Sequence, residues 1–446
     1  MYLSGNAEHQ RLSRSQTSVN LVDWFGLRAV APSRDRHSEL QPNREHKHHV
    51  GIIFDNVAAC PPDASNMKVF YISREMLRRG IQVTWVQLGG KERRRVNDGI
   101  ELLQLSSPGI RIVGTVLGVL KILKHCLSSQ ISIVYVDEWL FFRRRPTIRL
   151  ILQVMLRIGG IRFIFDQRDP FIDYEVANGQ VREGSFSHCL LQLQYRLIYR
   201  LCSLIVLPSR AYVEALQGDG VPRSKLLGTV RGVDQKLFKP MDDPSELKNS
   251  LGISDKFVVG FFGHMSNVNH EVSDVIVPLI MNLPAVIPNS FVLVGGGGDP
   301  PVSFDQLKLV DPPLPYRYLG RVPYSDLPKY LAACDVLLCP VSPLFKITRL
   351  SGPLKILETI AMGRPILVSY IKAKDEDYAH LKGVIWTGSK SNDFVLALDA
   401  IHSNYRHFLS EAAWQAAHIE DYTILNTISR IVDRAILVSQ DSRFGH

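Results

Sequence analysis

The segment RLSGPLKILETIAMGRPILV at 349–368 is the most informative part of this sequence. It predicts a loop, one short helix and a buried strand. Ser351 or Gly352 can cap the helix, and Pro353 suits its first position, where no amide donor is needed. Gly363 then ends the helix, and the apolar run after it begins the next strand.

The start of this helix has the properties of an anion site. Helix N-termini gather N–H groups and positive dipole density, which favour a pyrophosphate. Lys355 adds a full positive charge there. Glu358 follows three residues later on the same helix face, where it can accept hydrogen bonds from a neighbouring ribose. The predicted nucleotide-binding residues of this segment are Arg349, Ser351, Gly352, Leu354, Lys355 and Glu358. The alternative interpretation is a surface helix with an ordinary solvated glutamate.

Length and charge limit the class of protein. The 446 residues, 46% of them hydrophobic, suffice for two domains with large cores. A net charge of +9 favours acidic partners, namely phosphates, nucleic acid or an anionic membrane. The sequence has no RNA-binding signature and no zinc-finger spacing, so we expect no nucleic acid partner.

Cysteine usage and hydropathy bear on the compartment. No cysteines form a C-x-x-C pair, so we expect six buried, reduced thiols and a cytoplasmic protein. The N-terminus lacks an apolar signal core. The apolar runs 110–123 and 147–165 are interrupted by charges, so we expect neither to span a bilayer. Contact with the inner face of a membrane is compatible with this pattern.

Strands alternate with helices along most of the chain, which predicts parallel sheets covered on both faces. Residues 1–47 are polar and we expect them to be poorly ordered. The predicted domains are 48–235 and 236–409, with a last helical stretch, 410–446, packing back on the first domain. The expected strands are 50–54, 83–87, 131–136, 162–165, 204–207, 257–262, 291–294, 316–319, 336–339 and 366–368, and the expected helices are 67–79, 272–282 and 327–333.

Carboxylates follow a buried strand of the first domain. Asp166 and Asp169 lie where open parallel sheets bind ligands. Either can serve as a general base that removes the proton of a substrate hydroxyl. The alternative is that Arg168 pairs with one of them and only orders the loop. Asp137 and Glu138, after the preceding strand, compete for the catalytic role.

Two further loops of the second domain are candidates for ligand contact. Gly263 and His264 follow a buried strand, and we expect them to contact the bound nucleotide. Gly295–Gly298 is expected to be a flexible turn beside the same site. Asp375–Asp377 is the one Asp-x-Asp pattern, but neighbouring lysines favour a solvated loop, so no metal site is expected.

Basic clusters in the first domain suggest contact with anionic lipid. Arg93–Arg95, in an expected loop, and Arg143–Arg145 lie near amphipathic stretches. Solvated surface charge is the alternative for each cluster.

The order of these signals resembles the GT-B fold glycosyltransferases, especially the family 4-like group. The motifs that carry the resemblance are Arg231-Gly-Val-Asp234 with Phe238, Gly260–Gly263, Phe291–Gly298, Leu319–Val322 with Asp326–Pro328, Cys334–Pro340 and Pro353–Pro365. The resemblance implies two doubly wound Rossmann-like α/β domains facing a cleft. It also implies a nucleotide-sugar bound mainly by the second domain, an acceptor held by the first, and no metal or cofactor.

Two departures from the family pattern stand out. Many retaining members have a second glutamate eight residues before the one that matches Glu358, and here that position is Leu350. The loop Gly263–His270 also lacks the Arg and Lys that members often place there. Despite these departures, the resemblance implies a glycosyltransferase acting on a polysaccharide or lipid-linked acceptor. A nucleotide-sugar epimerase of related fold and a non-catalytic scaffold subunit remain the alternatives.

Overall fold

The computed structural model describes residues 49–440 except 56–63, 89–92, 98, 106–110, 139–145, 178, 242, 266–270, 299, 301, 342–349, 351 and 371–376. Several predictions therefore lie outside the described residues. These are the polar tail 1–47 and the residues Cys60, Arg143–Arg145, Arg349, Ser351, Asp375 and Glu376.

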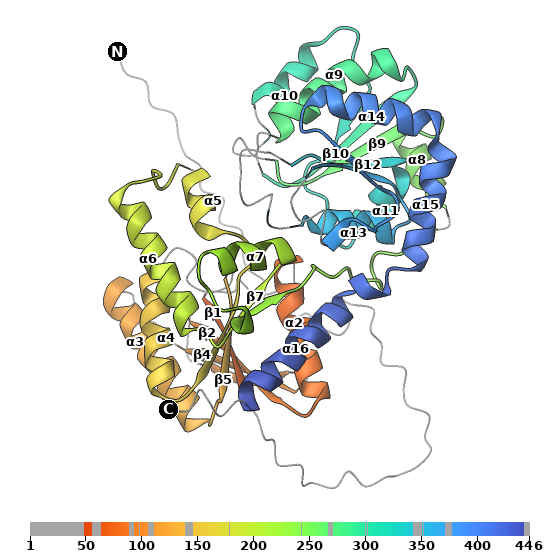
Figure 1. Ribbon diagram of the computed structural model, residues 1–446. Helices are drawn as coiled ribbons and strands as arrows, with labels where there is room; N and C mark the ends of the chain where they lie inside the picture. The colour runs from red at the N-terminus through yellow and green to blue at the C-terminus, as the bar shows by residue number, and fades with distance from the viewer. Residues whose placement is uncertain are drawn as a thin grey trace, which may run out of the picture. The chain divides into compact units, whose positions relative to one another are not determined.

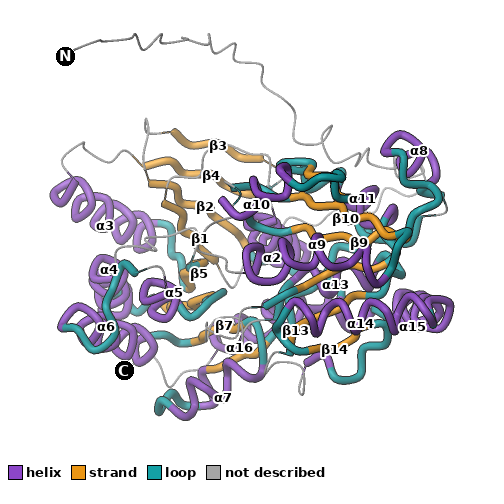
Figure 2. The backbone as a smooth tube through the Cα atoms, turned by 90° about the horizontal axis from the view of Figure 1, so that it is seen from above, coloured by secondary structure: helices purple, strands orange, loops and turns teal. Residues whose placement is uncertain are grey.

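The first domain contains an eight-stranded sheet in the order β3-β4-β2-β1-β5-β6-β7-β8, and Figure 2 shows its strands from above. Its strands are β1 His49–Asp55, β2 Gln82–Leu88, β3 Arg93–Asn97, β4 Ile100–Leu105, β5 Ile133–Asp137, β6 Arg162–Asp166, β7 Leu204–Leu207 and β8 Leu226–Gly228. All neighbouring strands pair in parallel except β3, which runs antiparallel to β4. The fully buried β5 and β7 explain why these strands read as continuous apolar runs.

The prediction that Arg93–Arg95 form a loop is wrong, because they lie in the edge strand β3. Their side chains are exposed, and Arg94 forms an ion pair with Glu101 of β4. Charged side chains suit an edge strand because they discourage pairing with another chain. A run of three arginines gave no period-2 hydrophobic signal by which to recognise the strand.

Helices cover both faces of the first sheet (Figure 1). They are α2 Ala64–Arg78, α3 Arg111–Ser128, α4 Pro146–Ile158, α5 Phe171–Ala177, α6 Phe186–Leu201 and α7 Arg210–Gly218, with the 3-10 turn η1 Arg223–Lys225. Side chains of α3, α4, α6 and α7 share one hydrophobic core with the sheet. Side chains of α2 form a second core on the opposite side.

The second domain has a six-stranded, all-parallel sheet in the order β11-β10-β9-β12-β13-β14. Its strands are β9 Phe257–Phe262, β10 Ser290–Gly295, β11 Tyr316–Tyr318, β12 Val336–Cys339, β13 Ile366–Ser369 and β14 Val384–Thr387. The helices are α8 Ser245–Leu251, η2 Val272–Ile276, α9 Val277–Val286, α10 Val302–Gln306, η3 Leu307–Leu309, α11 Leu327–Ala333, α13 Leu354–Ala361, α14 Ser391–Ser403 and α15 Tyr405–Ala417. Both faces of this sheet are again packed against helices.

The end of the chain belongs to the core of the first sheet. After the turn η5 Glu420–Tyr422, helix α16 Ile424–Gln440 buries Ile428, Ile431 and Val432 in the core that contains α2 and β1. The backbone of Val233 pairs with Thr423 just before this helix. The apolar face of an amphipathic helix must be buried, and α16 buries it here.

The predicted α/β class with two Rossmann-like parallel sheets is confirmed. Besides β3, three strands were not predicted, namely β4, β8 and β14. Of the five cysteines in the described ranges, four are buried as expected, but Cys189 is exposed on α6. Among the described helices, none combines the length and the apolar character that a membrane span requires.

Candidate functional site

The strand order of the second sheet reverses at β9. Strand β10 lies on one side of β9 and β12 on the other. Helices that follow such strands diverge to opposite faces, which opens a crevice at the carboxyl end of the sheet where α/β proteins bind ligands. Gly263 and His264 follow β9 directly, at this position.

Helix α13 begins near this position with an uncapped N-terminus. Pro353 is its N-cap, and no side chain caps the helix. The predicted cap by Gly352 and the placement of Pro353 inside the first turn are therefore wrong by one residue, because the extended ψ of 131° at Pro353 keeps it out of the helix. Gly363 ends the helix as predicted, with a φ of 68°. A helix start without a side-chain cap leaves its first N–H groups available to a ligand.

Lys355 lies in the first turn of α13 and extends to the end of β9. Its Nζ is 5.0 Å from the centroid of the Phe261 ring. A Cβ atom built on Gly263 would lie 3.0 Å from the same Nζ. Because Gly263 has no side chain, the ammonium group can occupy this corner. The structure thus brings together two predicted donor-binding residues that are 92 positions apart in the sequence.

Glu358 is buried, with 6% of its surface exposed, so the interpretation as a solvated surface glutamate is wrong. The hydroxyl of Tyr324 donates a hydrogen bond of 2.7 Å to its Oε1. Burial raises the pKa of Glu358 to about 7, against the opposing effects of the Tyr324 hydrogen bond and the charges of Lys355 and Arg231. A buried carboxylate with a strongly raised pKa is characteristic of ligand-binding and catalytic sites.

The glycine run after β10 packs directly on the loop after β9. The Gly263 amide donates to the Gly295 carbonyl at 3.0 Å, and the Met265 amide donates to the Gly297 carbonyl at 2.8 Å. A Cβ atom on Gly296 would lie only 1.9 Å from the Gly263 carbonyl oxygen. Glycine is required where two backbones approach this closely. The backbone of the glycine run therefore packs directly against Gly263.

His264 lies beside the last glycine of that run. A Cβ atom on Gly298 would approach His264 Cε1 to 2.9 Å. Gly298 also has a φ of 100°, which favours glycine. His264 and Gly263 thus stand at the end of β9, in the position predicted for donor contact.

Leu350, the position at which related sequences have a second glutamate, packs on the cores of both domains. Its carbonyl oxygen accepts a hydrogen bond from the Ser209 hydroxyl of the first domain. An apolar side chain suits this contact, and a carboxylate here would need a polar partner.

The first domain carries a cluster of acidic side chains at the carboxyl end of its sheet. Asp137 and Asp166 are paired across β5 and β6. Arg168 donates from Nε to Asp137 at 2.8 Å. Asp166 is 1% exposed, lies 2.7 Å from Lys68 Nζ, and accepts a hydrogen bond from Tyr135. Cations and a hydroxyl thus satisfy both acids within the protein.

Asp169 lies at the accessible edge of this cluster, with 21% of its side chain exposed. Its amide donates to Glu138 Oε2 at 3.4 Å. Glu138 is buried, and this burial raises its pKa to about 8 although Arg149 opposes the shift. Of the two predicted catalytic residues, Asp169 rather than Asp166 has a surface that an acceptor could reach.

Arg231 connects the two groups of candidate residues. Its Nη2 lies 3.4 Å from Asp169 Oδ1 and 3.3 Å from the Arg168 carbonyl oxygen. Its positive charge also lowers the pKa of Glu358. The sequence showed Arg231 only as part of a family motif, and nothing in its spacing indicated that it would lie near acids from both domains.

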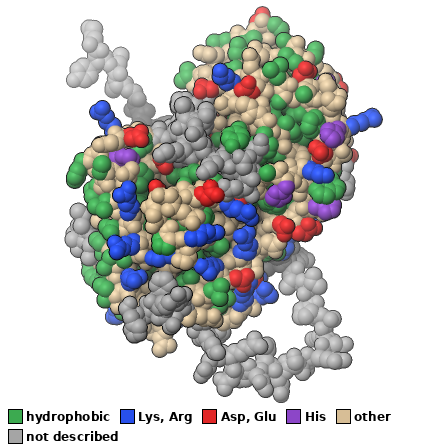
Figure 3. Space-filling view, viewed as in Figure 1, with side chains coloured by type: hydrophobic (Ala, Val, Ile, Leu, Met, Phe, Trp, Pro, Cys, Tyr) green, Lys and Arg blue, Asp and Glu red, His purple; other side chains and the backbone are tan. Residues whose placement is uncertain are grey.

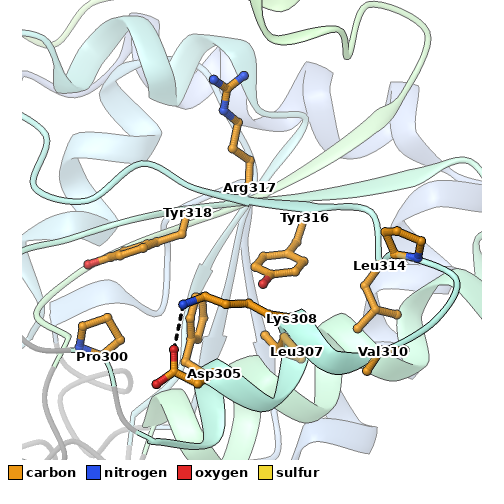
Figure 4. A pocket seen from close by; sticks show the side chains of 11 residues that line it. Pro300, Asp305, Leu307, Lys308, Val310, Leu314, Tyr316, Arg317 and Tyr318 are labelled. Carbon is orange, nitrogen blue, oxygen red and sulfur yellow. Dashed lines mark hydrogen bonds and ion pairs between the residues drawn. The ribbon is translucent and has the colours of Figure 1, made fainter.

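A separate cavity of about 430 Å³ lies at the β11 edge of the second sheet. Figure 4 shows Tyr316 and Tyr318 beside Asp305 and Lys308, which form an ion pair, while Arg317 points away from them. None of the predicted site residues lines this cavity. It is therefore not the nucleotide site indicated by α13.

Asp377 contradicts the interpretation of Asp375–Asp377 as a solvated loop. It is 3% exposed and accepts a hydrogen bond of 3.0 Å from the Arg210 amide. The mixed charge of the surrounding sequence did not reveal this contact with the N-terminal end of α7. In the part of the chain that the structure describes, no group of three or more metal-ligating side chains is positioned to hold a metal ion.

The second sheet and its helices match a known family model. Residues 256–404 match the model described as "Glycosyl transferases group 1". This range contains Gly263, the glycine run, Lys355 and Glu358. Residues 256–404 are thus similar in sequence to the group 1 glycosyl transferases. The first domain lies outside the matched range.

A curated relative of this chain is the probable glycosyltransferase WbjE of Pseudomonas aeruginosa, 26% identical over 230 residues. The match covers 50% of this chain, and the chain spans about half the length of that relative, 54%.

Solved structures show that the whole described chain has the GT-B fold. Anabaena Alr3699/HepE in complex with UDP and glucose aligns over 87% of this chain and 100% of its own, with a TM-score of 0.63 and 15% identity. Sucrose-phosphate synthase of Thermosynechococcus elongatus aligns over 88% and 100%, with a TM-score of 0.64 and 14% identity. At these identities the likeness concerns the fold.

Proposed function

We propose that this protein is a glycosyltransferase that moves a sugar from a nucleotide-sugar donor to an acceptor. The observation that carries the proposal is Glu358, a buried acid in the first two turns of α13 whose pKa is raised to about 7. Burial of this carboxylate lowers the stability of the protein unless a ligand forms hydrogen bonds with it. A ribose offers two hydroxyl donors to such a carboxylate, in place of the Tyr324 hydroxyl.

The donor diphosphate would bind at the start of α13. The N–H groups of Gly352, Leu354 and Lys355 and the Lys355 ammonium group provide positive potential there. Arg231 can add a second cation, since its charge already acts on Glu358. Lys355 and Arg231 would then replace the Arg and Lys that related enzymes often have after the first strand of this domain.

Nucleotide-bound relatives support this choice of donor. The matched HepE structures contain UDP, UDP with glucose, and UDP-glucose. A matched Escherichia coli structure contains UDP-2-fluoro glucose. A nucleoside diphosphate sugar is therefore the donor class that we propose, without a bound metal or other cofactor.

The acceptor would bind at the acidic cluster of the first domain, with Asp169 as the general base. Asp169 is the accessible acid of the two predicted catalytic residues. We propose a polysaccharide or lipid-linked acceptor, reached from the cytoplasmic side of a membrane. The matched WaaG structure, a glycosyltransferase of lipopolysaccharide biosynthesis, supports an acceptor of this class.

Thermal unfolding with a panel of nucleotides and nucleotide-sugars tests the donor site. A ligand that binds only the folded protein raises its melting temperature, by an amount that grows with the logarithm of its affinity. We expect Glu358→Gln to weaken the affinity for the preferred nucleotide by about 10- to 100-fold, the equivalent of lost hydrogen bonds to a charged group. Glu246→Gln, an exposed glutamate of the same domain, is the matched control.

Product analysis tests the reaction. A transferase releases nucleotide and extends an acceptor, whereas an epimerase converts the donor in acceptor-free buffer. Activity should persist in EDTA. Equal nucleotide affinity of the wild type and Glu358→Gln would refute the proposed site.

A further inference from the structure

Three neighbouring helices of the first domain expose an unusual number of large apolar side chains. Helix α4 contacts both α3 and α6, so the three form one layer. Their exposed apolar side chains are Leu117, Leu120 and Leu127 of α3, Ile151, Val154 and Ile158 of α4, and Phe186, Leu190, Leu193 and Leu197 of α6. We refer to these ten residues as the α3–α4–α6 face.

On each helix the exposed residues form one stripe. Phe186, Leu190, Leu193 and Leu197 are three or four residues apart, the spacing that places side chains on one helix face. The residues of α3 and α4 have similar spacing. Other side chains of these helices, such as Leu123 and Leu191, pack on the core of the first sheet. The stripes are therefore additional to the faces that hold the helices in place.

The charge of this layer has a single sign. Helices α3, α4 and α6 contain no aspartate or glutamate. Among the side chains that the structure describes on these helices, the exposed charged ones are Lys124, Arg157, Arg196 and Arg200. Figure 3 shows hydrophobic and basic side chains next to one another over the first domain. Exposed apolar stripes together with basic side chains indicate an interaction site rather than ordinary protein surface.

We propose that the α3–α4–α6 face docks on an anionic lipid bilayer. Apolar side chains on amphipathic helices enter the boundary between headgroups and acyl chains, while basic side chains contact anionic headgroups. A layer without any acidic residue fits this partner. The four cations make a second copy of the same face a poor partner, because a twofold interface would bring the like charges together.

This surface differs from the basic clusters that the sequence indicated. Arg93–Arg95 lie on the edge strand β3 and have no exposed apolar stripe among their described neighbours except Val96. The membrane proposal therefore rests on α3, α4 and α6. Its connection to a lipid-linked acceptor rests on the proposed function, but the docking itself does not.

Vesicle co-sedimentation of the full-length protein tests the docking. We expect binding to vesicles that contain phosphatidylglycerol, and at least tenfold weaker binding to phosphatidylcholine alone. The double variant Ile158→Glu/Phe186→Glu should lose at least tenfold in affinity for the anionic vesicles. These side chains are 82% and 83% exposed, so their replacement leaves the core intact.

The matched control replaces two similarly exposed apolar residues of the second domain, Leu309→Glu/Leu396→Glu, 84% and 70% exposed. It adds the same charge and should bind vesicles like the wild type. Nucleotide-induced thermal shifts should be unchanged in both double variants, which separates docking from the donor site. Equal vesicle binding by both double variants would overturn the proposal. So would a stable dimer that dissociates on Ile158→Glu/Phe186→Glu without any vesicle binding by the wild type.

Discussion

Two buried acids of the first domain and one of the second are held in opposite ways. In the first domain, Asp137 and Asp166 lie at the ends of adjacent strands, each against a cation. In the second, Glu358 is buried with a neutral hydroxyl as its hydrogen-bond donor, and its pKa is raised to about 7. An acid that is paired with a cation of the protein stabilises the ligand-free protein. An acid without a directly bound cation marks the place where an incoming ligand can supply the missing partner.

Within the first domain the same contrast separates Asp166 from Asp169. Lys68 and Tyr135 occupy the carboxylate of Asp166, which is 1% exposed. Asp169 is 21% exposed, and its ion pair with Arg231 is long at 3.4 Å. The comparison favours Asp169 over Asp166 as the proposed general base.

The largest expected effect is that of Asp169→Asn. If Asp169 is the general base, kcat should fall by about 10²- to 10⁴-fold, the usual contribution of a positioned base. Nucleotide affinity should change far less than kcat, because Asp169 lies in the first domain and is connected to the proposed diphosphate site only through its ion pair with Arg231. Steady-state kinetics together with nucleotide thermal shifts measure the two quantities.

Asp166→Asn is the matched comparison for that variant. It leaves Lys68 without its buried carboxylate, so the free energy of unfolding should fall by roughly 3 kcal/mol in denaturant titrations. The folded fraction should retain kcat. The reverse pattern, with Asp166→Asn inactive and Asp169→Asn active, would reverse the assignment.

The second largest effect is expected for Lys355→Ala. Its ammonium group lies against the end of β9, where the diphosphate would develop charge as it leaves. Loss of one such preorganised hydrogen-bond donor lowers kcat by about 10²- to 10³-fold. Lys329→Ala is the matched control, since Lys329 is an exposed lysine of the same domain that pairs with Asp326. Similar kinetics for the two variants would show that Lys355 does not contact the donor.

The pH dependence of stability sharpens the assignment of Glu358. Its pKa is raised from an ordinary value of 4.5 to about 7 in the folded protein, so its contribution to stability is present below pH 4.5 and is lost as the pH rises through 7. The variant Glu358→Gln cannot titrate. Relative to the wild type, its free energy of unfolding should be unchanged near pH 4.5 and higher by about 3 kcal/mol near pH 8.

Denaturant titrations at several pH values measure this difference. Glu246→Gln, at an exposed position, should follow the wild-type curve throughout. A Glu358→Gln variant that is more stable at alkaline pH and yet binds nucleotide poorly would show that the buried acid serves function at the expense of stability. Parallel curves for the wild type and Glu358→Gln would contradict the assignment.

The fold followed from periodicity, because parallel strands covered on both faces leave long apolar runs. The runs at β9, β12 and β7 gave strand positions that agree with the structure. The short strands β8 and β14 are partly exposed and gave no such run. The edge strand β3 was missed because its arginines have the composition of a loop.

The donor half of the candidate site was more accessible to sequence reasoning than the acceptor half. Lys355 and Glu358 belong to one short helix, so their spacing placed them on the same face. The contacts that decide the role of Asp166, from Lys68 and Tyr135, come from elements 98 and 31 residues away. No local pattern encodes such contacts. The same holds for Tyr324, which reaches Glu358 from the loop before α11.

The smallest effect is expected where a glycine makes room for the donor site. A Cβ atom at Gly263 would lie 3.0 Å from Lys355 Nζ and 3.1 Å from the Phe261 ring, so Gly263→Ala should displace the ammonium group by a few tenths of an ångström. A displaced cation still attracts a diphosphate, so nucleotide affinity should fall only a few-fold, roughly 1 kcal/mol or less. Titration calorimetry measures this change.

Gly297→Ala provides the comparison for Gly263→Ala, because a Cβ atom there meets nothing closer than 3.7 Å. It should bind nucleotide like the wild type although it lies in the adjacent glycine run. The Gly263 amide bonds to the same glycine run, and an alanine has the same backbone amide. Gly263→Ala should therefore change nucleotide affinity only by displacing Lys355, and its melting temperature should be nearly unchanged. If Gly263→Ala instead lowers the melting temperature and leaves affinity intact, the glycine serves packing, and the corner beside Lys355 is not where the diphosphate binds.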